Sequence, residues 1–145
     1  MGKPINFKRA PAWHAIRCNG NPSMNTDLLI VDDDVAVCDS LKVVLELNDY
    51  DVHTCRDARR AIAIIGATPV SLAIIDSNMP NVSGARATEL IRELSSEILI
   101  IGISAEANRE EEMRSAGANA FLAKPLDMDR LNQTIDHLLE GDVVA

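Results

Sequence analysis

Residues 70–80 read VSLAIIDSNMP, and this stretch indicates the fold class of the chain. The run from Val70 to Ile75 is almost entirely apolar, and Asp76 follows it directly. An apolar run of this length, without the alternation of a half-exposed strand, is typical of a strand that is buried on both faces. Such strands occur mostly in parallel sheets covered by helices. The stretch therefore favours an α/β fold.

Similar apolar runs recur along the chain, and segments with apolar residues at helical spacing separate them. The predicted strands cover residues 28–31, 51–55, 70–75, 98–103 and 120–122. The predicted helices cover residues 37–45, 58–65, 87–94, 108–115 and 131–139, with Gly141 ending the last one. Five strand–helix units predict a five-stranded parallel sheet with helices on both faces. An open, doubly wound sheet is favoured over a barrel, because a barrel needs eight such units.

The composition indicates one globular domain. The chain has 145 residues, of which 47% are hydrophobic and 25% charged. No apolar run approaches the length of a membrane span and no signal peptide is evident, so we expect a soluble, cytoplasmic protein without membrane contact. The cysteines at 18, 38 and 55 are odd in number and irregularly spaced, which argues against structural zinc or a disulfide framework. Cys38 lies on an apolar helical stripe and is predicted to belong to the core.

The charge is unevenly distributed along the chain. Residues 1–25 contain four basic residues and no acidic one, although the formal charge of the whole chain is −8. Their proline, glycine and asparagine content predicts a flexible basic extension, either inert or an arm that contacts a partner. Residues 26–141 form the predicted domain, and residues 142–145 a C-terminal tail. A domain this acidic is not expected to bind nucleic acid directly, but it could attract divalent cations.

Polar side chains follow four of the predicted strands, where ligands bind in such sheets. Asp32 and Asp33 follow the first strand, Asp76 the third, Ser104 the fourth and Lys124 the fifth. Carboxylates crowded at one edge repel each other unless a cation joins them, and hard oxygen ligands suit Mg²⁺. A lysine and a small hydroxyl group can then contact a phosphoryl group, which makes Asp76 a candidate nucleophile for an aspartyl phosphate.

Each of these residues also has a purely structural interpretation. Asp34, and less readily Asp33, is suited to be the N-cap of the following helix. Ser104 is equally suited to cap the helix after it, and Lys124 before Pro125 fits a surface turn. Their joint placement at the ends of four strands is what favours a common site.

Four segments, LLIVDDD, LAIIDSNMPNVSG, IIGISAEA and GANAFLAKPL, resemble in order and spacing the receiver domain of two-component response regulators. The resemblance covers about residues 27–140. It implies a flavodoxin-like (βα)5 fold with strand order 2-1-3-4-5, and its extent is similar to that of single-domain, chemotaxis-type receivers. It also implies a partner that donates a phosphoryl group, either a histidine kinase or a histidine phosphotransfer protein.

By motif position, the resemblance makes Asp76 the phosphorylated residue. Asp32 and Asp33 then hold Mg²⁺ together with Asp76 and the backbone carbonyl of Asn78. Lys124 pairs with the phosphoryl group. The domain is expected to be a phosphoacceptor switch that catalyses its own phosphotransfer and dephosphorylation, and not an enzyme that turns over a separate substrate.

The resemblance also implies a conformational switch. Ser104 is the hydroxyl residue that moves toward the phosphoryl group, and Phe121 is the aromatic residue that turns into the vacated space. The bond between Lys124 and Pro125 is expected to be cis. The surface of the fourth helix, fifth strand and fifth helix then signals to a downstream protein that the sequence does not identify, and homodimerisation is left open.

Two other interpretations remain. The chain is alternatively the receiver part of a longer DNA-binding regulator or hybrid kinase. A phosphatase of the haloacid dehalogenase type also uses an aspartate at a strand end, but it needs a second acid two residues later, where this chain has Asn78. Nucleotide-binding enzymes are poorly supported, since the sequence contains no glycine-rich phosphate loop.

Overall fold

The computed structural model describes residues 26–141, in which strands and helices alternate. The elements run β1 (Asp27–Val31), α2 (Val35–Leu47), β2 (Asp51–Cys55), α3 (Ala58–Ala67), β3 (Leu72–Asp76), α4 (Gly84–Leu94), β4 (Leu99–Ser104), the 3₁₀ helix η1 (Ala107–Arg109), α5 (Glu110–Ala116), β5 (Ala120–Ala123) and α6 (Met128–Glu140). The predicted extension at residues 1–25 and the predicted tail at residues 142–145 lie outside the described residues.

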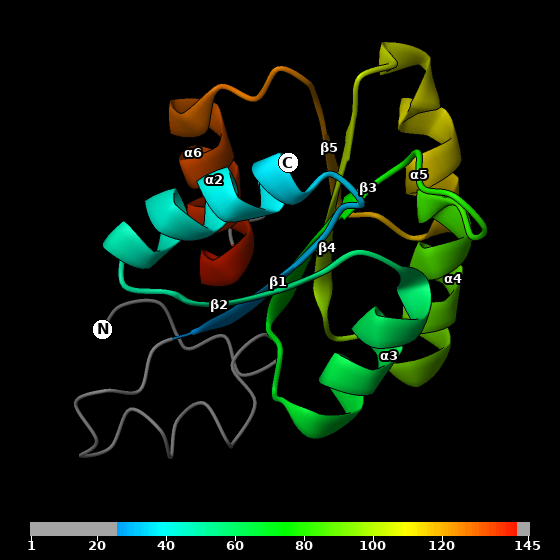
Figure 1. Ribbon diagram of the computed structural model, residues 1–145, viewed down its shortest axis with the longest axis horizontal. Coiled ribbons are helices and arrows are strands. Elements are labelled where there is room, and N and C mark those ends of the chain that lie inside the picture. The colour runs from blue at the N-terminus through cyan, green and yellow to red at the C-terminus, as the bar shows by residue number, and fades with distance from the viewer. Residues whose placement is uncertain (1–25, 142–145) are drawn as a thin grey trace.

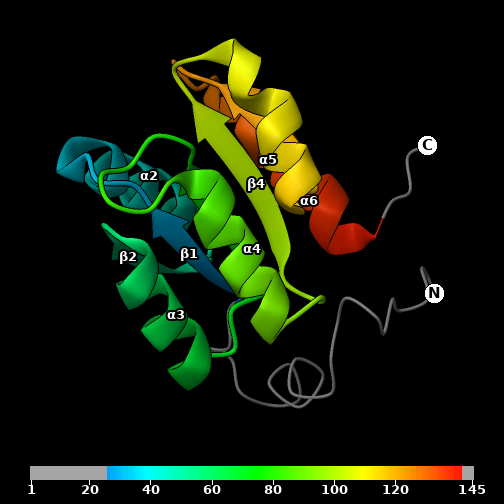
Figure 2. The same cartoon turned by 90° about the vertical axis from the view of Figure 1, so that its right-hand side faces the viewer.

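The strands form one parallel sheet in the order β2-β1-β3-β4-β5, which confirms the expected topology. Helices α2 and α6 cover one face of the sheet, and α3, α4 and α5 cover the other (Figures 1 and 2). The chain winds first toward one side of β1 and then toward the other. The carboxyl ends of β1 and β3 therefore lie side by side at the point where the winding reverses.

Alternate residues of each strand contact the helices on opposite faces, which divides the core into two clusters. On the face of α3, α4 and α5 the cluster includes Leu29, Val31, Ala73, Ile75, Ile91 and Met113. On the face of α2 and α6 it includes Leu28, Ile30, Ile74, Leu41, Leu131 and Ile135. Both faces of the central strands are thus apolar, which explains why their sequences show no polar alternation.

Local signals at the helix ends agree with the structure. Asp34 caps α2, and its side chain accepts a hydrogen bond from the Ala36 backbone N–H, as predicted. Gly141 ends α6 in the left-handed conformation with φ of 74°, as expected for a C-terminal glycine. The longest helices have 13 residues, and none within residues 26–141 is long and apolar enough to cross a bilayer.

Some predicted boundaries were wrong by one or two residues. Strand β3 begins at Leu72 and not at Val70, because the Val70 N–H bonds the Thr68 carbonyl in a tight turn before pairing with β1 begins. Strand β4 begins at Leu99, and the segment predicted as one helix at 108–115 opens as the 3₁₀ turn η1 before α5. Asp76 and Ser104 are the last residues of β3 and β4 and do not follow them.

Candidate functional site

Three carboxylates meet at the carboxyl edge of the two central strands, the edge marked by the arrowheads of β1 and β4 in Figure 2. Asp32 and Asp33 follow β1, and Asp76 ends the neighbouring strand β3. One oxygen from each of the three lies within 4.8 Å of the others. Asp32 and Asp76 are buried, whereas Asp33 is exposed. The site is therefore a small acidic cluster with one side open to solvent.

Lys124 reaches this cluster from the end of β5. Its Nζ lies 3.0 Å from Oδ2 of Asp32 and 3.6 Å from Oδ1 of Asp76. The backbone fixes its position, because the Lys124 N–H donates a 2.7 Å hydrogen bond to the carbonyl of Ser104. One ammonium group thus lies between two buried carboxylates, and the surface-turn interpretation of Lys124 is wrong.

The charges of the site shift the pKa values of its members. Burial raises the pKa of Asp76 from 3.8 to about 6, and the negative charge of Asp32 adds to this effect, while Lys124 and the Asn78 backbone N–H partly oppose it. Burial by itself lowers the pKa of Lys124, but its hydrogen bond to Asp32 and the charges of both carboxylates outweigh this, so the pKa is raised. The lysine therefore stays charged, and the cluster retains excess negative charge.

Backbone N–H groups orient the two buried carboxylates. The Asp34 N–H donates a 2.9 Å hydrogen bond to Oδ1 of Asp32. The Asn78 N–H lies 3.4 Å from Oδ1 of Asp76, and the Asn78 side chain is exposed beside the cluster. These bonds hold the Asp32 and Asp76 side chains at the sheet edge.

Ser104 and Phe121 occupy the neighbouring strands. Ser104 is fully buried at the end of β4, one position past Ile103, which is paired with Asp76. Its Oγ accepts a 2.9 Å hydrogen bond from the Glu106 N–H. Phe121 is half-buried in β5 and packs on the core under α3, α4 and α5. The structure thus brings Ser104 to the same edge of the sheet as the carboxylates, with Phe121 behind it in the next strand.

Comparison with known proteins identifies the family. A family model described as the response regulator receiver domain matches residues 28–136. The chain belongs to this family. It is 32% identical over 110 residues to the sensor histidine kinase RcsC of Salmonella typhi, an alignment that covers 74% of this chain and 12% of RcsC. The chain therefore spans only a small part of that relative.

Two solved structures show how well the receiver domain superposes. A CheY-like receiver domain protein from Methanospirillum hungatei has a TM-score of 0.76 at 29% identity, with 81% of this chain and 95% of that one covered. The response regulator TrrA from Thermotoga maritima, in complex with Mg²⁺–BeF, has a TM-score of 0.73 at 25% identity, with 78% and 98% covered. The family and the flavodoxin-like fold expected from the sequence are both confirmed.

One residue that shapes the site of this receiver domain, Gly84, was missed by the sequence analysis. A Cβ atom at this first residue of α4 would lie 2.1 Å from the Asp76 carbonyl oxygen and 2.6 Å from Cα of Ser77. The Gly84 N–H also donates a 2.9 Å hydrogen bond to the carbonyl of Ser77. Only glycine allows α4 to start this close to the end of β3. The pair Ser83-Gly84 at a helix start was the available signal, but it does not reveal which backbone lies opposite.

Two further expectations agree with the structure of the receiver domain. The bond between Lys124 and Pro125 is cis. Cys38 is buried on the core-facing side of α2, and burial, together with the charge of Asp32, raises the pKa of its thiol to about 11. Cys55 is also buried, and burial raises the pKa of its thiol to about 11. These two thiols are structural at neutral pH.

Proposed function

We propose that this receiver domain is a phosphoacceptor switch in which Asp76 accepts a phosphoryl group from a phosphohistidine. The donor is a histidine kinase or a histidine phosphotransfer protein. The observation that supports this best is the buried Asp76 carboxylate, which has oxygens of Asp32 and Asp33 within 4.8 Å and the Lys124 ammonium 3.6 Å away. A buried carboxylate nucleophile next to both a cation and further acidic ligands suits phosphoryl transfer.

The proposed reaction needs little covalent chemistry from the protein. An Asp76 oxygen forms a bond to phosphorus while the P–N bond of the phosphohistidine breaks, and the imidazole leaves with the bonding electrons. With a pKa of about 6, Asp76 is mostly ionised at neutral pH and ready to attack. The hydrogen bonds and the buried wall around Asp76 hold its carboxylate in place, so catalysis rests on positioning and electrostatics.

Mg²⁺ is the cofactor that fits the acidic cluster. Three carboxylate oxygens within 4.8 Å of one another are hard ligands, and their excess negative charge is what a divalent cation relieves. We assign the ion to Asp32, Asp33, Asp76 and the carbonyl of Asn78. When bound, it supplies positive charge against the oxygens of the phosphoryl group. The TrrA structure, which is in complex with Mg²⁺–BeF, supports Mg²⁺ as the ion.

Lys124 and Ser104 are proposed to hold the phosphoryl group after transfer. Lys124 already contacts Asp76, and its ammonium group needs only a small movement away from Asp32 to pair with a phosphoryl oxygen. Ser104 would give up its hydrogen bond from the Glu106 N–H and turn its hydroxyl toward the same oxygens. Movement of Ser104 leaves room for Phe121 to turn inward.

The output surface is proposed to be formed by α5, β5 and α6, which are the fourth helix, fifth strand and fifth helix of the (βα)5 fold. Phosphorylation shifts this surface between two states, which a downstream protein or a second copy of the chain recognises. Helix α5 is short and polar and buries only Met113, so few of its side chains hold it to the core.

The test is Mg²⁺-dependent labelling by a small-molecule phosphodonor. We expect wild type to be labelled, Asp76→Ala to be unlabelled, and the exposed-carboxylate control Asp39→Ala to behave as wild type. Labelling of Asp76→Ala at the wild-type level would refute the assignment of Asp76. Turnover of an ordinary phosphate monoester would instead favour a phosphatase.

A further inference from the structure

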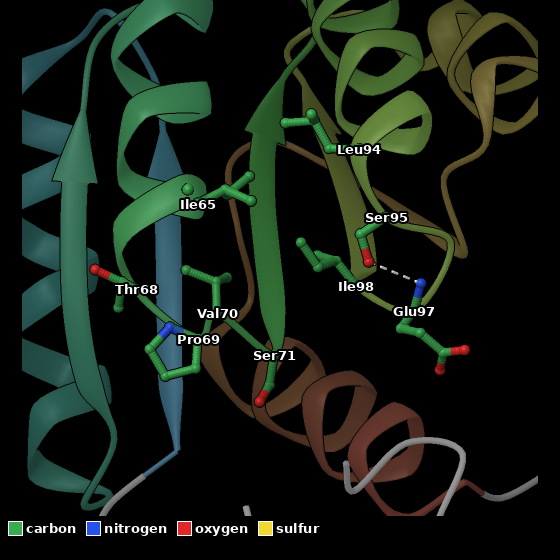
Figure 3. A pocket seen from close by; sticks show the side chains of 10 residues that line it. Ile65, Thr68, Pro69, Val70, Ser71, Leu94, Ser95, Glu97 and Ile98 are labelled. Atoms are coloured by element: carbon green, nitrogen blue, oxygen red, sulfur yellow. Dashed lines mark hydrogen bonds between the residues drawn. The ribbon is translucent and has the colours of Figure 1, made fainter. Parts of the chain in front are cut away.

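A groove lies at the amino edge of the sheet, opposite the acidic cluster. It opens between the carboxyl ends of α3 and α4 and has a volume of about 450 Å³. Its walls include Ile65, Gly66, Val70, Ser71, Leu94 and Ile98. In the view of Figure 3, Ile65 lies to the left of β3 and Leu94 to the right, and their side chains point toward each other. The proposed phosphoacceptor site uses none of these residues.

The groove is apolar where a partner would be buried. Leu94 is 56% exposed although it is a large hydrophobic residue, and Ile65 is half-exposed opposite it. Val70 and Ile98 are buried and form the floor. Glu97 is an exposed acid on the rim, where its backbone N–H bonds the Ser95 hydroxyl. The groove therefore suits an apolar side chain carried by a segment with positive charge.

The chain itself carries such a segment in residues 1–25. Residues 1–25 lead directly into β1, and the carbonyl of Asp27, the first residue of β1, accepts a 2.9 Å hydrogen bond from the N–H of Ser71 in the groove wall. The thirteen residues from Trp13 to Asn25 span up to about 40 Å when extended, at roughly 3.3 Å per residue. The N-terminal segment can therefore reach every part of the groove.

The composition of this segment matches the groove. It contains four basic residues and no acidic one, and it carries Trp13 and Ile16 in the stretch PAWHAIRC. We propose that residues 1–25 dock in the groove of the same chain, with the Trp13 ring between Ile65 and Leu94 and the basic residues facing Glu97. Covalent attachment gives the segment a high effective concentration, so a weak intrinsic affinity suffices.

Trp13 is the single tryptophan of the sequence, which makes docking measurable in the full chain. We expect the acrylamide quenching constant of wild type to be well below that of the same protein unfolded in urea. Gly66→Leu adds a side chain to the groove wall at a position where the Cβ meets no atom within 4 Å. It should raise the quenching constant to the unfolded value. The control Ala63→Leu adds the same side chain to α3 beside a different groove, and should leave quenching at the wild-type value.

A second variant tests the proposal independently of Gly66. Leu94→Lys removes an exposed apolar wall and places a cation beside a basic segment, so it too should expose Trp13 while far-UV circular dichroism stays unchanged. The proposal is overturned if Trp13 is already as quenchable as in the unfolded chain, or if both groove variants leave it protected. Protection that disappears on dilution would also overturn it, because Trp13 would then occupy the groove of a second copy.

Discussion

Replacing Gly84 with alanine tests how closely α4 packs against the strand that carries Asp76. The added methyl carbon would lie 2.1 Å from the Asp76 carbonyl oxygen, whereas real Cβ contacts essentially never fall below 3.0 Å. Both of its nearest neighbours are backbone, so no side chain can rotate away. The start of α4 must therefore move away from β3.

The expected cost follows from two effects. Overpacking in a tight core costs about 1–3 kcal/mol. Displacement of α4 also strains the hydrogen bond between the Gly84 N–H and the Ser77 carbonyl, which is worth about 1 kcal/mol. We expect Gly84→Ala to lower the free energy of unfolding by about 3 kcal/mol. Phosphodonor labelling should also slow, because α4 no longer packs against the backbone of Asp76.

The matched control is Gly66→Ala, the same change in a helix where the new methyl group meets no atom within 4 Å. Alanine is favoured over glycine inside a helix by about 1 kcal/mol, so this variant should be more stable than wild type. Urea unfolding followed by circular dichroism measures both variants. If Gly84→Ala unfolds within about 0.5 kcal/mol of wild type, the close approach of α4 to β3 is wrong.

Three further predictions concern ion binding, helix packing and thiol reactivity. Mg²⁺ affinity measured by calorimetry should fall roughly tenfold from about pH 7 to about pH 5, because Asp76 has a pKa of about 6 and must be deprotonated to bind the ion. An affinity that stays constant over this range would contradict the raised pKa of Asp76. Arg92→Met should lower the free energy of unfolding by about 2–3 kcal/mol, since the guanidinium bonds two backbone carbonyls and a side-chain amide that join α4 to the loops before β4 and β5. Arg92→Lys should be destabilised as well, because an ammonium group cannot make the same set of hydrogen bonds as a planar guanidinium. Urea unfolding measures both variants, and a wild-type free energy of unfolding for Arg92→Lys would show that only the positive charge matters. In a Cys18→Ser variant, Cys38 and Cys55 should react slowly with a thiol reagent near pH 8, because burial raises the pKa of each thiol to about 11. Both thiols should react rapidly once the protein is unfolded. A fast reaction in the folded protein would show that the core opens.

The fold was predictable because burial on both faces leaves a clear mark on the central strands. The runs that became β1, β3 and β4 contain no polar alternation, and this feature alone favoured a covered parallel sheet. Strand ends were less predictable. Val70 is apolar and buried, yet it lies in a turn, because the burial of a residue does not determine whether its backbone pairs with a neighbouring strand.

The sequence predicted which residues form the site better than it predicted the contacts between them. A parallel sheet brings strand ends together, so Asp32, Asp76 and Lys124 could be placed at one edge from the sequence. The contact of Lys124 with Asp32 was not predicted, because it depends on how far a flexible side chain reaches across the neighbouring strands. The close approach at Gly84 was equally invisible, since it depends on the distance between two backbones remote in sequence.

The contact between Lys124 and Asp32 also has a consequence for synthesis on the ribosome. The two residues are 92 positions apart, so the acidic cluster leaves the ribosome well before the lysine that balances it. A nascent chain that ends before β5 carries all three carboxylates but not their cationic partner. The ion pair between Lys124 and Asp32 can therefore form only after β5 has been synthesised.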